Sequence, residues 1–173
     1  MAFESPSHPR SISAPSAGST TAFAADVASL LSRSGDRQQD IVQLVDRILE
    51  EALRERTSDI HIEATRGGTL IRFRRDGMLR PVLLLPAEFH ESLTARLKLL
   101  GNLRLDEHRR PQDGRIERSG VSPATLRVAT IPTLYGEKMA LRILEESSDM
   151  RSLADLGLAA SWLPVVQGAI ERP

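Results

Sequence analysis

The sequence contains no cysteine and few aromatic residues, with one Trp, one Tyr and four Phe among its 173 positions. The absence of cysteine excludes disulfide scaffolds, cysteine-based zinc sites and thiol nucleophiles. No run of apolar residues is longer than the four of Val82–Leu85, whereas a membrane-spanning helix requires about 20. Residues 1–20 include three prolines and lack the apolar block of a secretory signal. These absences predict a soluble, cytoplasmic protein.

The sequence also lacks a phosphate-binding loop. None of its 11 glycines begins the string G-x-x-x-x-G-K-[ST], and none opens G-x-G-x-x-G. We therefore expect that this chain binds no nucleotide cofactor alone and is not by itself an enzyme that hydrolyses ATP.

Charge is balanced overall, with 23 basic and 23 acidic residues, but it is unevenly distributed. Residues 40–63 hold seven acids against three bases, and residues 96–127 hold eight bases against four acids. Nucleic-acid binding by the basic segment is one alternative, but residues 102–127 contain no aromatic side chain on which a base could stack. We therefore expect no nucleic-acid partner.

Composition divides the chain into three parts. Residues 1–38 are rich in Ser, Ala and Pro and are predicted to form a flexible arm outside the fold. Residues 39–150 carry the periodic patterns of a folded domain, and residues 151–173 are predicted to form a linker and a short helix.

Within the folded part, apolar residues recur at helical spacing in 40–53 and 89–100, and Gly101 is expected to end the second helix in a left-handed conformation. Period-two alternation predicts strands at 59–63, 70–75, 78–85, 115–118, 126–131 and 137–144. Asp76-Gly77 is a hairpin signal between the second and third of these strands. The expected class is α+β, an antiparallel sheet flanked by helices.

Asp59, His61 and Glu63 alternate on one face of the first predicted strand. Histidine and carboxylates can bind metals or transfer protons, but neighbours along one strand face converge poorly on one ion. We therefore favour polar groups that pair with arginines, and we assign no metal.

The segment 104–115 is strongly basic. Asp113-Gly114 could form a turn that directs Arg110 and Arg115 from a loop towards the phosphate of a partner. On composition alone, a solvated basic loop with local ion pairs is the preferred interpretation.

Four motifs in order change this preference. They are Ser58-Asp-Ile-His-Ile-Glu63, Ile71-Arg-Phe-Arg-Arg-Asp-Gly77, Arg110-Pro-Gln-Asp-Gly-Arg115, and Leu126-Arg-Val-Ala-Thr-Ile-Pro-Thr133 followed by Tyr135-Gly-Glu-Lys138. From about Asp40 to Pro173 the chain resembles the domain that precedes the catalytic core in type II secretion and type IV pilus assembly ATPases. Ala64, Arg75 and Ala129 depart from that pattern, which leaves the subfamily open and does not affect the basic loop.

The resemblance implies a PAS-like domain that packs against an ATPase core in a hexamer and moves relative to it during turnover. It also implies that Arg110, Arg115 and Arg127 contact nucleotide phosphate held by the core. Asp59, His61, Glu63, Asp113 and Gly114 are then family motif residues with a structural role. Expected partners are the core, neighbouring subunits and inner-membrane platform proteins.

Leu156-Gly-Leu158 and Arg172-Pro173 match positions just before the family's phosphate loop. The resemblance therefore implies a fragment that is catalytically inactive, with ATP and Mg²⁺ bound only by the full-length protein. The alternative is a stand-alone interaction module that docks on a secretion or pilus inner-membrane platform without contacting nucleotide.

Overall fold

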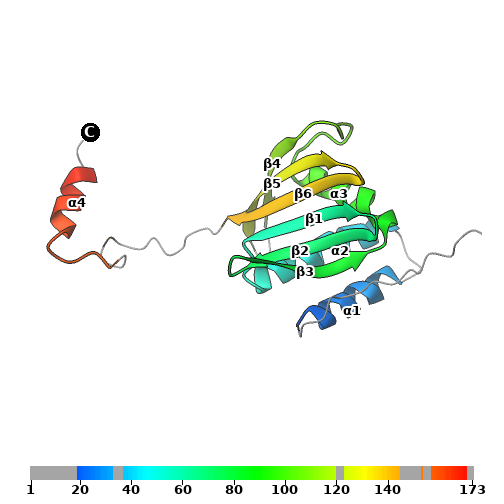
Figure 1. The fold of residues 1–173 in the computed structure, drawn as a ribbon, viewed down its shortest axis with the longest axis horizontal. Helices are drawn as coiled ribbons and strands as arrows, with labels where there is room; N and C mark the ends of the chain where they lie inside the picture. Colours follow the sequence, from blue (N-terminus) through cyan, green and yellow to red (C-terminus); the bar gives the residue numbers. More distant parts are fainter. Residues whose placement is uncertain (1–18, 33–36, 120–122, 145–152, 154–156, 171–173) are drawn as a thin grey trace, which may run out of the picture.

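The computed structural model describes residues 19–32, 37–119, 123–144, 153 and 157–170. Six strands form one sheet in the order β3-β2-β1-β6-β5-β4, and every neighbouring pair is antiparallel (Figure 1). The strands are β1 (Asp59–Thr65), β2 (Gly68–Arg75), β3 (Met78–Leu85), β4 (Gln112–Arg118), β5 (Ala124–Thr133) and β6 (Gly136–Leu144). The helices are α1 (Ser19–Leu31), α2 (Arg37–Arg54), α3 (His90–Leu100) and α4 (Leu163–Ile170), with a short 3-10 turn at Ala87–Phe89. The expected α+β class with an antiparallel sheet is confirmed.

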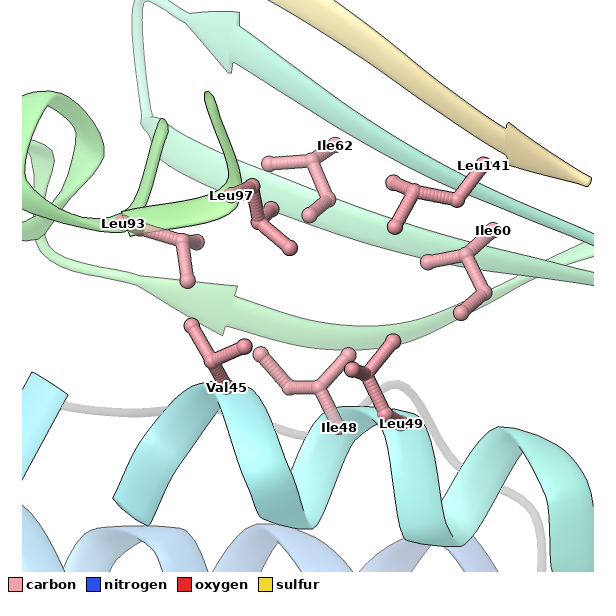
Figure 2. Close-up of a pocket in the computed structure, with 8 residues that line it drawn as sticks. All are labelled: Val45, Ile48, Leu49, Ile60, Ile62, Leu93, Leu97 and Leu141. Carbon is pink, nitrogen blue, oxygen red and sulfur yellow. The ribbon is translucent and has the colours of Figure 1, made fainter. Parts of the chain in front are cut away.

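Helices α2 and α3 cover one face of the sheet, and the core lies between the two layers (Figure 1). Figure 2 shows the side chains that meet there from α2, α3, β1 and β6. They are Val45, Ile48, Leu49, Ile60, Ile62, Leu93, Leu97 and Leu141, and each is almost fully buried. The helical and period-two patterns therefore place their apolar residues on the same interface.

Helix α1 corrects the expectation that residues 1–38 lie outside the fold. Its buried residues Phe23, Val27 and Leu30 recur at helical spacing and pack against α2 and β3. Asp26 also pairs with Arg47 of α2. The alanine-rich composition concealed this stripe because alanine adds little to hydrophobicity while favouring a helix. Residues 1–18 and 33–36 of the predicted arm lie outside the described residues.

Two glycines act differently from the sequence-based expectation. Asn102, not Gly101, adopts the left-handed conformation after α3, with φ of 53° against −87°. Gly101 is instead required by packing, since a Cβ there would lie 2.6 Å from Cγ1 of Val128. Gly114 lies inside β4 and not in a turn, and a Cβ there would lie 2.7 Å from Cδ2 of Leu103. Asp76 and Gly77 form the hairpin turn that their sequence predicts, with φ of 50° and 75°.

Candidate phosphate-binding site

The sheet face opposite α2 and α3 is polar, and no described helix covers it (Figure 1). Side chains on this face alternate with buried ones along each strand, as at Ile60 and Ile62 of β1. The predicted strand-face residues Asp59, His61 and Glu63 lie here. The open face is therefore built by the same alternation that forms the core.

Three arginines form a row across this face. Register pairs Arg115 of β4 with Arg127 of β5, and Arg127 with Arg142 of β6. Their side chains are 63%, 68% and 70% exposed. Directly opposed residues project from the same side of a sheet, and like charges in that position repel. Among these residues, sequence analysis had assigned a phosphate role to the first two only.

Acidic neighbours neutralise the row incompletely. Asp113 lies 3.5 Å from Arg127, and Glu117 lies 3.9 Å from Arg115. Exposed pairs at such distances contribute little because water screens them. The row therefore keeps donors that can bind an anion, and Asp113 is placed beside it as a partner of Arg127.

Asp59 and Glu63 are each held by two cations. Asp59 lies 2.9 Å from Arg142 and 3.4 Å from Arg74, and Glu63 pairs with Arg72 and with Lys138, the latter at 2.8 Å. Burial alone would raise the pKa of each carboxyl, but these cations hold both pKa values below the usual range. The two carboxylates thus tie β1 to the strands on either side of it.

His61 lies between these ion pairs on β1. Burial, followed by the charges of Lys138, Arg72 and Arg74, lowers its pKa below the ordinary value of 6.5. The imidazole is therefore neutral at pH 7. Within the described residues, no group of three His, Cys, Asp or Glu side chains could hold a metal ion.

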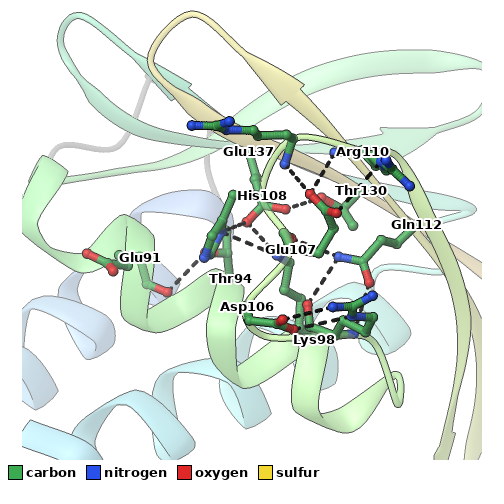
Figure 3. A network of polar contacts seen from close by, with 12 residues as sticks. Glu91, Thr94, Lys98, Asp106, Glu107, His108, Arg110, Gln112, Thr130 and Glu137 are labelled. Atoms are coloured by element: carbon green, nitrogen blue, oxygen red, sulfur yellow. Dashed lines mark hydrogen bonds and ion pairs between the residues drawn. The ribbon is translucent and has the colours of Figure 1, made fainter.

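The loop between α3 and β4 is anchored by a buried ion pair (Figure 3). Lys98 Nζ lies 2.6 Å from Glu137 Oε2 and donates to the Glu107 carbonyl at 2.7 Å, and both charged side chains are buried. Glu137 also accepts from Thr130 and contacts His108 Nδ1 at 2.7 Å. These contacts fix the loop against α3, β5 and β6.

Arg110 extends from this anchored loop. Its backbone N–H, like that of Arg109, donates to Glu107 Oε1, so the acid shapes the turn that carries both arginines. The Arg110 side chain is 84% exposed and lies 3.9 Å from Glu107 Oε2. Both predicted alternatives, an exposed arginine and local ion pairing, thus describe the same residue. The structure brings Arg115 and Arg127 together on β4 and β5, whereas Arg110 lies in the loop before them.

Sequence reasoning missed three residues of this region: Lys98, Glu137 and Arg142. The alternation in 137–144 places Arg142 on the face opposite Leu141, which is a usable signal. Its position beside Arg127 depends on register and has no local signal. Lys98 resembles an ordinary helical lysine until the following loop buries it.

None of the described helices is long and apolar enough to span a bilayer. The fold and site thus define an α+β domain whose open sheet face carries arginines and which holds no phosphate loop of its own.

Comparison with known proteins identifies the family. The family described as Type II/IV secretion system protein matches residues 34–173. The chain is 38% identical over 135 residues to the type IV pilus assembly ATPase PilB of Myxococcus xanthus, covering 77% of this chain and 24% of that protein. It is 40% identical over 134 residues to the type II secretion system protein E of Klebsiella pneumoniae, covering 77% of this chain and 27% of that protein.

A solved structure of the pilus retraction motor PilT with bound ADP is also similar. It matches 69% of this chain and 34% of its own, with 22% identity and a TM-score of 0.47. The sequence matches establish that this chain belongs to the type II/IV secretion system protein family, which includes type II secretion and type IV pilus ATPases. The chain spans about a quarter of the length of these curated relatives.

Proposed function

We propose that this chain is the accessory N-terminal domain of a hexameric secretion or pilus motor ATPase. In this proposal the domain is PAS-like and cytoplasmic, and it supplies Arg110, Arg115 and Arg127 to nucleotide held by a separate catalytic core. ATP and Mg²⁺ bind to the full-length protein, and motion of the domain is coupled to hydrolysis. Its partners are the core, neighbouring subunits and inner-membrane platform proteins.

One observation carries the proposal: Arg115 and Arg127 are directly opposed on an open sheet face, with more than half of each side chain exposed. Arginine's planar fork suits phosphate oxygens, and arginine brought to a phosphoryl group stabilises the charge of the transition state. Without a phosphate loop in this chain, that phosphate must be bound by another domain.

The test is ATP turnover in a longer protein in which this domain precedes an ATPase core. Arg115→Gln and Arg127→Gln are expected to lower kcat at least about tenfold each, because each removes a cation from the transferred phosphate. Arg80→Gln is the matched control. Arg80 is exposed on edge strand β3, and its register partner Phe73 is buried, so Arg80 lies on the opposite face of the sheet.

Unchanged turnover in both row variants would overturn the proposed phosphate contact. If the same variants still bound inner-membrane platform proteins, the result would support the interaction module that contacts no nucleotide. Loss of turnover in Arg80→Gln as well would indicate a nonspecific effect of removing surface charge.

A further inference from the structure

Arg142 is an exposed arginine at the centre of the sheet, on β6, next to Arg127 in register. Its partner on the other side is Asp59 of β1. The row of arginines therefore continues one strand beyond the two that the family motifs indicate, and ends at a carboxylate.

Asp59 holds Arg142 from that side. Arg142 Nε donates to Asp59 Oδ1 at 2.9 Å, and Asp59 is itself fixed by Ser58 Oγ at 2.9 Å and Arg74 at 3.4 Å. The Asp59 side chain is only 13% exposed, whereas that of Arg142 is 70% exposed. A guanidinium carries five N–H donors, and this contact uses the one on Nε. Arg142 is thus anchored at Nε while most of its side chain faces solvent.

The spacing of the row suits an extended anion with several charges. Neighbouring strands lie about 4.8 Å apart, so the backbones of Arg115 and Arg142 are separated by about 10 Å. A single carboxylate could engage one of these guanidinium groups, whereas a chain of phosphates could contact three. Binding such a chain would also relieve the repulsion between directly opposed arginines.

We infer that Arg142, anchored by Asp59, is a third phosphate-binding arginine, which together with Arg115 and Arg127 receives the triphosphate of a nucleotide. The inference rests on the proposed function for the identity of the ligand, and it adds a residue that the motifs did not indicate. The chain as a whole has no net charge, so general attraction of polyanions does not account for binding at this row.

The experiment titrates the 173-residue chain with sodium tripolyphosphate and, separately, with ATP at low ionic strength. Binding is followed through backbone amide NMR shifts of β4, β5 and β6. We expect Arg142→Gln to weaken binding of both ligands about three- to fivefold, the range expected for one exposed charge contact. Arg80→Gln is expected to leave both affinities unchanged, since that residue lies on the other face. Thermal unfolding is recorded for each variant because Arg142→Gln also removes the pair with Asp59.

The inference is overturned if Arg142→Gln binds as tightly as Arg80→Gln, or if the wild-type chain shows no shifts. A lower Tm with unchanged affinity would mean that Arg142 only ties β6 to β1. Binding of tripolyphosphate but not ATP would overturn the assignment to a nucleotide. These results are separable from the proposed function, which fails only if Arg115→Gln and Arg127→Gln leave ATP turnover unchanged in the longer protein.

Discussion

Replacing Lys98 with methionine tests the buried network that anchors the basic loop. The side chain is 1% exposed, and its ammonium lies 2.6 Å from Glu137, whose own side chain is 8% exposed. Removing one partner of a buried ion pair costs about 3–5 kcal/mol, because the remaining charge is left uncompensated. Glu137 keeps Thr130 and His108, so we expect the free energy of unfolding to fall by about 3 kcal/mol.

The double variant separates charge burial from packing. In Lys98→Met with Glu137→Gln, no buried carboxylate remains, and the carbonyl of Glu107 still accepts from Gln112 Nε2 at 3.0 Å. We expect this variant to regain most of the lost stability, since apolar or neutral replacements of a whole buried pair are often nearly neutral.

The loss should also depend on pH. Burial would raise the pKa of Glu137, but hydrogen bonds from Lys98, His108 and Thr130 hold it below 4.5 in the wild type. The wild type therefore loses this contribution as pH falls below about 4.5. In Lys98→Met the pKa of Glu137 rises above its unfolded value, so the penalty is full at pH 7 and shrinks as the acid becomes protonated.

Urea unfolding followed by far-UV circular dichroism measures these differences at pH 7 and pH 4.5. Trp162 is 60% exposed and lies outside the sheet and its core, so its fluorescence would report poorly on this network. Lys138→Met is the matched control, because Lys138 pairs with Glu63 at 2.8 Å while 32% exposed, and should cost less than about 1 kcal/mol. A loss below about 1 kcal/mol in Lys98→Met, or a double variant as unstable as the single one, would refute the reasoning.

Two further predictions concern α1 and His61. Leu30→Ala should lower the free energy of unfolding by about 2–3 kcal/mol, because Leu30 is 3% exposed against the core; unchanged urea unfolding would show that α1 does not belong to the fold. The imidazole of His61 should titrate below pH 6.5 in an NMR titration, since burial and nearby cations disfavour its charge. The unfolded chain then binds more protons, so this residue's contribution to stability falls as pH drops below 6.5, and a midpoint above 6.5 would contradict the environment described for it.

Much of the fold is local in origin, which explains why the sequence predicted it. The stripe along α2 and the alternation of β1 and β2 follow from residue spacing, and Asp76-Gly77 selects its turn by backbone preference. Helix α1 was missed because its stripe is interrupted by alanines and acquires meaning only against α2. The start of β4 was missed because the need for glycine at 114 comes from Leu103, eleven residues earlier.

For the candidate site, the sequence by itself determined the residue types and their sheet face. Alternation placed Asp59, His61 and Glu63 together, and the motifs singled out Arg115 and Arg127. Only the tertiary structure decided that Arg115, Arg127 and Arg142 form one row and that Lys98 is buried against Glu137. The physical reason is that strand register and loop closure depend on pairing between distant segments, and no local preference of either segment specifies its partner.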